Sequence, residues 1–329
     1  MYPVMRNVFA YLSQETFCRA PGMEDHPFFP DRHRQVLDVL LAQGVLAPDG
    51  WQQAARLSME EVARRISPEL LAQLSSEEGV AHAMCAPEGA RDLRKSYVGP
   101  ALAATGATQA AVFAAFRQGF AVHLGGGFHH ASRTRAEGFC LLPDITLAVD
   151  ALREKWPGLP VMLVDLDAHH GNGVAADFAA DARTFVLDMF NADIYPRGPR
   201  PDMAAGLRVP LPSFCGDEAY LESLKMALDK AFAAFSPRLV IYNAGADVLS
   251  GDPLGRLGLS ARGLARRDAM VIEAVRGRGV PACVLMAGGY SSGVVAAVAD
   301  SLCGIALKFG VFRPKRPISQ SPEPAPRGC

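Results

Sequence analysis

Short apolar runs alternate with amphipathic stretches over the C-terminal two thirds of the chain. Runs without turn-forming residues, such as the one that ends near Asp167, predict buried strands, and stretches with an apolar residue every three or four positions predict helices. The predicted strands are 120–124, 160–167, 184–189, 239–244 and 281–286, and the predicted helices are 144–156, 217–235, 260–277 and 292–309. This alternation predicts a three-layer α/β/α fold with a predominantly parallel sheet.

The N-terminal third of the chain is predicted to be mostly helical. The pattern indicates a first strand at 4–12, an irregular segment at His26-Pro-Phe-Phe-Pro, and helices at 32–43, 58–65, 68–86 and 100–117. Residues 313–329 contain five prolines in 17 residues and are predicted to be disordered. We therefore expect residues 1–312 to form a single domain.

Composition narrows the class of protein. The chain has 329 residues, half of them hydrophobic, so it contains enough apolar side chains for a sizeable core. A net charge of −1 and a pI near 6.7 exclude the global basic field that direct nucleic-acid binding requires. The start of the sequence lacks a signal-peptide pattern, and no apolar run approaches the length needed to span a bilayer. Both features predict a cytoplasmic protein. Seven scattered cysteines without a Cys-x-x-Cys pair argue against a disulfide framework.

Acidic residues and histidines gather where predicted strands end. Asp165, Asp167 and His169 would share one face if strand geometry persisted. Asp247 follows the predicted strand 239–244. Carboxylate and imidazole ligands suit Zn²⁺, with Mn²⁺ and Fe²⁺ as alternatives. Two aspartates and one histidine would leave an open coordination position, which is typical of a catalytic zinc site. For any one residue alone, a solvated turn is the simpler interpretation.

Two further loops carry residues suited to catalysis. His129 and His130 follow three glycines, and they would serve as metal ligands or as a general acid and base beside the metal. Tyr290 follows Gly288-Gly289, where its hydroxyl would hydrogen-bond a substrate oxyanion. Each residue taken singly is also compatible with an ordinary loop or surface position.

Taken in order, the motifs resemble the signature blocks of the zinc-dependent histone deacetylase superfamily over residues 120–310. The segment that begins at Asp188 and ends at Pro196 is most similar to the class IV branch, which has bacterial members. The other motifs that carry the resemblance are Gly125-Gly-Gly-Phe-His-His-Ala, Glu137-Gly-Phe-Cys, Asp165-Leu-Asp-Ala-His-His-Gly-Asn-Gly, Gly245-Ala-Asp-Val-Leu-Ser-Gly-Asp-Pro-Leu-Gly and Gly288-Gly-Tyr.

The resemblance implies an arginase/deacetylase fold with one zinc ion bound by Asp167, His169 and Asp247. It changes the role expected for Asp165, which would orient His129 and, with Asp188, help to bind a structural potassium ion. His129 and His130 would then transfer protons while Tyr290 polarises the substrate carbonyl. The substrate channel implied by the resemblance is lined by Gly138, Phe139, Tyr195 and Leu254.

Three departures from the family pattern bear on catalysis and recognition. Asn172 stands where class I enzymes have aspartate, a difference shared with class II and IV enzymes, so His130 is expected to be less strongly biased towards the charged imidazolium. Ala287 replaces the first glycine of Gly-Gly-Gly-Tyr. No loop acid that clamps the substrate backbone could be placed. Leu254 occupies the position at which polyamine deacetylases of the family carry glutamate, so we expect the enzyme to prefer acyl-lysine.

The function implied is zinc-dependent hydrolysis of acyl-lysine amides in peptides or proteins, with small acyl-amides as further possible substrates. One alternative is another amide or ureohydrolase on the same fold, either an acetylpolyamine deacetylase or an arginase-like enzyme with two metal ions. A second alternative is a catalytically silent module that binds acyl-lysine. Proton-transfer histidines and Tyr290 argue against such a module, because binding alone would not require them.

Overall fold

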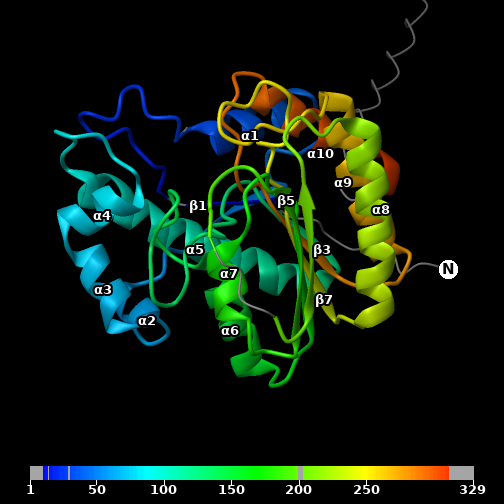
Figure 1. Ribbon diagram of the computed structural model, residues 1–329, viewed down its shortest axis with the longest axis horizontal. Helices are drawn as coiled ribbons and strands as arrows, with labels where there is room; N and C mark the ends of the chain where they lie inside the picture. Colours follow the sequence, from blue (N-terminus) through cyan, green and yellow to red (C-terminus); the bar gives the residue numbers. More distant parts are fainter. Residues whose placement is uncertain (1–9, 14, 29, 199–202, 311–329) are drawn as a thin grey trace, which may run out of the picture.

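A sheet of eight parallel strands forms the centre of the structure, a computed structural model that describes residues 10–13, 15–28, 30–198 and 203–310 (Figure 1). The strand order is β2-β1-β3-β8-β7-β4-β5-β6. The predicted α/β class with a parallel sheet is confirmed. The strands are β1 (Ala10–Ser13), β2 (Trp51–Ala54), β3 (Phe120–His123), β4 (Val161–Asp165), β5 (Thr184–Asn191), β6 (Gly206–Leu211), β7 (Leu239–Asn243) and β8 (Ala282–Leu285).

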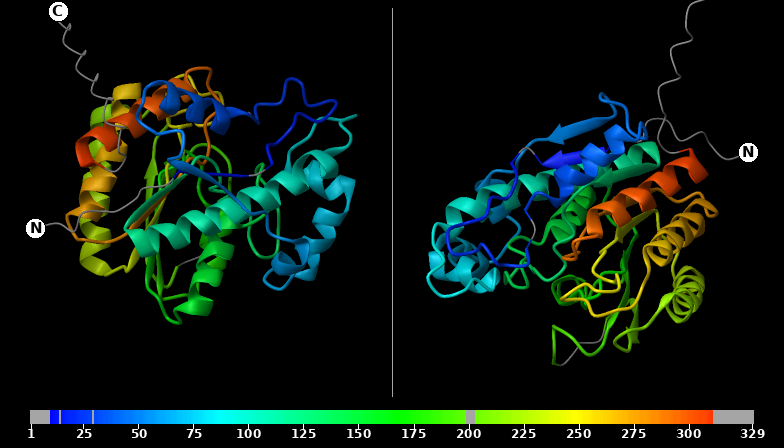
Figure 2. Two further views of the ribbon diagram at one scale, coloured as in Figure 1. Left: turned by 180° about the vertical axis from the view of Figure 1, so that it is seen from behind. Right: turned by 90° about the horizontal axis from the view of Figure 1, so that it is seen from above.

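Helices cover both faces of the sheet (Figures 1 and 2). The helices α5, α6 and α7 pack on one face, and α1, α8, α9 and α10 pack on the other. A smaller apolar cluster joins α2, α3 and α4 to the first half of α5. The helices are α1 (Arg32–Ala42), α2 (Met59–Ala63), α3 (Pro68–Ser75), α4 (Glu77–Ala83), α5 (Leu93–Gln118), α6 (Asp144–Lys155), α7 (Asn172–Asp177), α8 (Asp217–Ala234), α9 (Ala261–Arg276) and α10 (Val294–Phe309).

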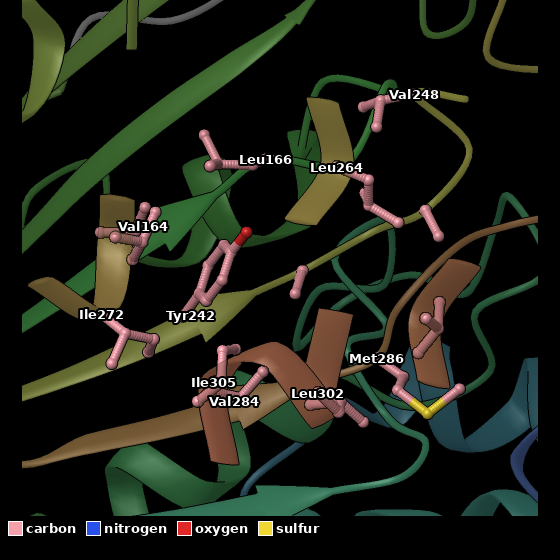
Figure 3. Packing of buried hydrophobic residues seen from close by; sticks show 14 of the residues in the cluster. Val164, Leu166, Tyr242, Val248, Leu264, Ile272, Val284, Met286, Leu302 and Ile305 are labelled. Atoms are coloured by element: carbon pink, nitrogen blue, oxygen red, sulfur yellow. The ribbon is translucent and has the colours of Figure 1, made fainter. Parts of the chain in front are cut away.

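The central strands are apolar on both faces because each face is covered by helices. In β4, Val164 belongs to the core beneath α9 and α10, whereas Leu163 belongs to the core beneath α5 and α6. Figure 3 shows the first of these cores, where Tyr242 and Val284 meet side chains of α9 and α10. Successive side chains of a strand point to opposite faces, and both faces are buried here. The sequence of β4 is therefore a continuous apolar run.

Several predicted boundaries were wrong for identifiable reasons. The predicted helix 68–86 is two helices, because the Ser76 hydroxyl accepts a hydrogen bond from Gly79 N (2.9 Å) and starts α4 anew. Helix α5 begins at Leu93, well before the predicted start, and the Glu77 carboxylate accepts hydrogen bonds from its first backbone amides. That acceptor comes from another helix, so local sequence could not reveal it.

The two strands at the edges of the sheet were missed, as was the short helix α7. Strand β2 has the sequence Trp-Gln-Gln-Ala, without an apolar face, and β6 contains Pro210. Proline is tolerated on an edge strand, where one side of the backbone has no partner. The predicted strand 4–12 lies mostly outside the described residues, which include β1 from Ala10 onward. The predicted C-terminal tail lies wholly outside them.

Helix α5 is the helix among the described residues that is long and apolar enough to span a bilayer by composition alone. Of its most apolar stretch, 72% is buried inside the domain. The helix packs against β1, β3 and α6. Its composition is therefore accounted for by its place in the core, although no apolar run of this length was expected from the sequence.

One buried cation organises the loops that leave β4 and β7. Arg267 of α9 is fully buried, pairs with Asp268 at 2.8 Å, and donates hydrogen bonds to the carbonyl oxygens of Leu166, Ala244 and Gly245. These carbonyls lie just beyond the carboxyl ends of the two central strands. Arginine suits the position because its planar group of donors serves several acceptors together.

We predict that Arg267→Met lowers the free energy of unfolding by roughly 3 to 5 kcal/mol, since it leaves the buried charge of Asp268 without its ion-pair partner and three carbonyls without their donor. Urea denaturation followed by circular dichroism measures this loss. The matched control is Arg266→Met on the same helix, because the exposed pair between Arg266 and Glu218 should contribute almost nothing. Equal stability of the two variants would contradict the role of Arg267.

Candidate functional site

Four loops meet at the carboxyl edge of the sheet. They follow β3, β4, β7 and β8, and they carry the histidine pair, the Asp165 segment, Asp247 and Tyr290. A pocket at this edge is lined by residues of three of these loops, by Phe28 and Arg32 from the N-terminal region, and by Gly138 and Phe139. The prediction that separate strands direct polar groups to one rim is therefore confirmed.

Asp167, His169 and Asp247 form a compact buried cluster. One ligand atom from each lies within 4.8 Å of the others. Nδ1 of His169 is 3.1 Å from Oδ1 of Asp167 and 2.8 Å from Oδ2 of Asp247. A single N–H cannot point at both carboxylates, whereas a cation between the three atoms would satisfy them all. Two oxygens and one nitrogen suit a borderline divalent ion.

The hypothesis that Asp165, Asp167 and His169 share one strand face was wrong. Strand β4 ends at Asp165, so strand geometry does not persist to the later residues. The Asp165 carboxylate instead accepts hydrogen bonds from the backbone amide of Asp167 (3.2 Å) and the side-chain amide of Asn243 (3.0 Å). Its other oxygen lies 2.8 Å from Nδ1 of His129, as the family resemblance implied.

Burial makes the charge of the cluster costly. It raises the pKa of Asp247 to about 7, with Asp167 adding to the effect. Burial would also raise the pKa of Asp167, but His129 and His169 lower it well below its usual range. The two aspartates in turn raise the pKa of His169 to about 10 against the effect of burial. A bound divalent cation would supply the compensating charge that the protonated histidine otherwise provides.

The two adjacent histidines have opposite electrostatic environments. Burial lowers the pKa of His129, but Asp165 and Asp167 outweigh it and raise the value to about 9. Burial and the neighbouring His129 hold the pKa of His130 well below its usual range. The rings lie 4.2 Å apart between centroids. A cationic and a neutral imidazole side by side are suited to giving and accepting protons.

Tyr290 is held in the pocket by its backbone. Asp252 accepts hydrogen bonds from the amides of Tyr290 (2.8 Å) and Ser291 (3.1 Å), and its other oxygen accepts from Leu254 and Gly255, both at 3.0 Å. Burial raises the pKa of the Tyr290 hydroxyl well above its usual value, and Asp167 adds to this. The phenol therefore stays protonated and serves as a hydrogen-bond donor.

The segment before Tyr290 needs small residues because it lies against the carboxylates of Asp167 and Asp247. A side chain at Gly288 would come within 2.5 Å of Asp167 and 2.7 Å of Asp247, and the amide of Gly288 donates to Asp167 at 2.9 Å. Ala287 has a φ of +47°, in the left-handed region that glycine adopts more readily. This conformation explains why glycine is usual at this position in the family pattern, and it means that the backbone of Ala287 is locally strained.

Sequence reasoning missed three residues that support the site. Arg32 of α1 lines the pocket and donates hydrogen bonds to the carbonyl oxygens of Ala287 and Gly289. Asp144 accepts from the amides of Gly127 (2.8 Å) and Phe128 (2.7 Å), which fixes the loop before the histidines. Asp252 is the third. All three act over long sequence separations, so the local pattern carries no signal for them.

Two of the four expected channel residues line the pocket, and the other two do not. Gly138 and Phe139 line the pocket, both with positive φ, and the Phe139 ring packs edge-on against Tyr290 with centroids 6.0 Å apart. Tyr195 and Leu254 are not among the residues that line it. Tyr195 is 42% exposed and lies edge-on against the His130 ring at 5.0 Å. Leu254 is half-buried in the loop that Asp252 fixes.

Asp188, expected to assist a potassium site, lies beside Asp165 in the register of β4 and β5. One oxygen accepts hydrogen bonds from His170 and from Gly171 N, whereas the other is buried without a hydrogen-bond partner among the described residues. Burial and the charge of Asp165 raise the pKa of Asp188. An unpartnered buried carboxylate oxygen is the type of ligand that a hard monovalent cation takes.

Comparison with known proteins agrees with this geometry. The Histone deacetylase domain family model matches residues 26–306. Histone deacetylase 2 of Arabidopsis thaliana is 40% identical over 209 residues, which are 64% of this chain and 52% of that protein. An uncharacterized protein of Picosynechococcus sp. is 28% identical over 279 residues, which are 83% of this chain and 90% of that protein.

Two solved structures share the fold. The HDA15 HD domain superposes with a TM-score of 0.73 at 24% identity, and the alignment covers 92% of each chain. A histone deacetylase homologue in complex with SAHA also gives a TM-score of 0.73, at 23% identity, and covers 92% of this chain and 84% of that one.

The chain belongs to the histone deacetylase family. It spans about half the length of Arabidopsis Histone deacetylase 2 and 47% of Histone deacetylase 8 of Xenopus tropicalis, which is 33% identical over 179 residues. The interpretation that it belongs to the class IV branch stays a prediction.

We predict that Asp167→Ala and His169→Ala each abolish stoichiometric binding of a divalent metal, because each variant removes one of three protein ligands. Metal content after dialysis, measured by inductively coupled plasma mass spectrometry, gives the readout. Asp300→Ala removes an exposed carboxylate outside the cluster and should leave metal content unchanged. Full metal content in either ligand variant would contradict the assignment.

Proposed function

We propose that the chain hydrolyses acyl-lysine amides with one zinc ion held by Asp167, His169 and Asp247. The observation that carries this proposal is the buried cluster of these three residues, of which Asp167 lines the pocket that Tyr290 and both histidines also line. Zinc bound there supplies Lewis acidity, which makes water more acidic and an amide carbonyl more electrophilic. The remaining chemistry falls to side chains of the chain itself.

The histidine pair moves the protons that amide hydrolysis requires. His130 presents a neutral ring, so its free nitrogen can take a proton from the attacking water. His129 is held cationic by Asp165, which places positive charge beside the reacting carbonyl and provides a proton for the leaving amine. One histidine can accept a proton and the other can donate one because their environments shift their pKa values in opposite directions.

Tyr290 donates its hydroxyl proton in a hydrogen bond to the oxygen that becomes negative during the reaction. Its burial keeps it protonated, and the hydrogen bonds from its backbone to Asp252 fix its position. Donors placed in advance at such an oxygen contribute strongly to catalysis. Phe139 lines the pocket, where it provides aromatic surface for the lysine stem and excludes competing water. Tyr195 lies outside the pocket lining, with its ring against that of His130.

Two further observations refine the proposal. Asp165, which ends the strand before Asp167, is engaged by His129 and Asn243, which supports one zinc ion rather than a pair of metal ions. Asp188 has a buried oxygen without a hydrogen-bond partner among the described residues, beside Asp165, and this supports a structural potassium ion there. Potassium would offset the two adjacent buried carboxylates and so stabilise the strand ends that hold the zinc ligands.

We predict that Tyr290→Phe keeps its metal but loses roughly 10² to 10³ in kcat, the typical effect of removing one oxyanion donor. Steady-state hydrolysis of an acetyl-lysine fluorogenic peptide measures the change. Tyr11→Phe, in a strand outside the pocket, is the matched loss of a hydroxyl and should retain normal turnover. Near-normal turnover by Tyr290→Phe would show that this residue is only part of the pocket wall.

Substrate class gives a second prediction, which rests on Leu254. An apolar residue cannot attract the distal ammonium of a polyamine, whereas Leu254→Glu should shift kcat/KM towards acetylpolyamines by charge complementarity. Competition between N-acetylspermidine and an acetyl-lysine peptide measures the shift. Leu254→Gln is the neutral control of matched size and should not produce it. Better hydrolysis of N-acetylspermidine than of every acyl-lysine peptide by the unmodified chain would contradict the proposal.

A further inference from the structure

The carboxylate of Glu137 lies at the centre of a small network beside the proposed catalytic pocket. Its Oε1 accepts a hydrogen bond from Nδ2 of Asn172 at 2.6 Å, and Oδ1 of the same amide lies 2.7 Å from Nδ1 of His130. Burial raises the pKa of the nearby Tyr195 hydroxyl, and the charge of Glu137 adds to this. Glu137 therefore contacts the residue that partners His130.

Hydrogen-bond chemistry fixes the direction of this chain. An ionised carboxylate only accepts, so Asn172 must turn its nitrogen towards Glu137 and its oxygen towards His130. The amide oxygen in turn accepts a hydrogen bond from Nδ1–H of His130. This arrangement holds whether the imidazole is neutral or charged, and it leaves Nε2 as the atom that takes and gives the proton.

An asparagine alone does not specify this arrangement. Its oxygen and nitrogen are nearly equal in size, so rotation of the amide by half a turn would present the NH₂ group to His130 instead. The ring would then carry its proton on Nε2 and could not accept another. An aspartate has two acceptors and would not need orienting, which is why a partner for the amide is required at Asn172.

We propose that Glu137 is a positioning residue that fixes the orientation of the Asn172 amide, and through it the tautomer of His130. The inference deepens the proposed function and rests on it for the role of His130 in proton transfer. The ring of Tyr195 lies directly against that of His130.

The loop around Glu137 is built to hold the carboxylate in place. Glu137 and Cys140 exchange two backbone hydrogen bonds, at 3.1 and 3.0 Å. Gly138 has a φ of +59°, and a side chain there would come within 2.5 Å of the His130 ring. A charge pair with Arg135 does not explain the placement, because that contact is 3.5 Å long and Arg135 is largely exposed.

The first test compares Glu137→Ala with Glu137→Gln. Alanine frees the Asn172 amide to rotate, so we expect kcat on an acetyl-lysine peptide to fall at least tenfold while metal content is unchanged. Glutamine retains an acceptor oxygen and should keep kcat within about threefold of the unmodified chain. Glu154→Ala, which removes an exposed carboxylate paired with Arg65, is the control and should have no effect. Equal kcat for Glu137→Ala and the unmodified chain would overturn the proposal.

The second test exchanges the two partners. Asn172→Asp alone places two carboxylates 2.6 Å apart and should reduce kcat. Combining it with Glu137→Gln restores a donor that faces an acceptor, so the double variant should recover most of the lost activity. A merely structural role for Glu137 predicts additive losses instead. Failure of the double variant to exceed Asn172→Asp would overturn the proposal.

A readout independent of activity separates this inference from the proposed function. Nitrogen-15 NMR of labelled histidine reports which ring nitrogen carries the proton, and the His130 signal is assigned by its loss in His130→Gln. We expect the proton on Nδ1 in the unmodified chain and a shift towards Nε2 in Glu137→Ala. An unchanged tautomer in Glu137→Ala would overturn the positioning role. A changed tautomer in a chain that hydrolyses no acyl-lysine substrate would instead refute the proposed function.

Discussion

The burial of several carboxylates at one edge of the sheet is the constraint on which the site depends. Asp165, Asp167, Asp188 and Asp247 are all almost completely shielded from solvent; Asp165 ends β4, Asp167 and Asp247 follow β4 and β7, and Asp188 lies within β5. Buried carboxylates persist only when they are paired, hydrogen-bonded or bound to a cation. Their partners therefore determine the arrangement of the surrounding loops.

Each partner serves the geometry of the site as well as the charge. Backbone amides of Ala168 and Gly288 hold Asp247 and Asp167, at 2.8 and 2.9 Å, so the two ligands keep fixed orientations. His129 and His170 form hydrogen bonds with the two aspartates that do not join the three-residue cluster. The cluster itself also needs positive charge, which a bound divalent ion would supply. The burial of these carboxylates thus determines both the electrostatics of the fold and the proposed chemistry.

The site also depends on close approach of backbone segments. Gly288 lies against both aspartate ligands, and Gly138 lies against the ring of His130, where any side chain would collide. Arg32 of α1 and Arg267 of α9 then fix the carbonyl oxygens of neighbouring loops. Fixed donors and acceptors of this kind keep catalytic groups within the narrow range of geometry that hydrolysis requires.

Much of the fold could be predicted from the sequence because the central strands are buried on both faces. Their uninterrupted apolar runs locate β4 and β7 directly, and acids at their ends indicate the rim. The edge strands lack that signal. Ser76, which ends one helix and starts the next, and Glu77, which caps α5, act through contacts that local periodicity does not encode.

The candidate site was predictable to a similar degree. Residues that carry unusual chemistry in short motifs, such as His129, His169 and Tyr290, could be identified from the sequence. Strand alternation could not assign different roles to Asp165 and Asp167, because the strand ends between them. Glu137 appeared only as part of a motif, since its role depends on a hydrogen bond to Asn172, far along the chain.

The central claim is that one divalent ion in the buried cluster serves a hydrolytic site. The most direct measurement is the rate of amine release from an acetyl-lysine peptide as zinc is added to metal-free protein in known molar ratios. The account predicts a linear rise in rate that ends sharply at one zinc ion per chain. A break at two equivalents would contradict the single-metal site, and peptide binding without hydrolysis at any ratio would contradict the enzymatic function.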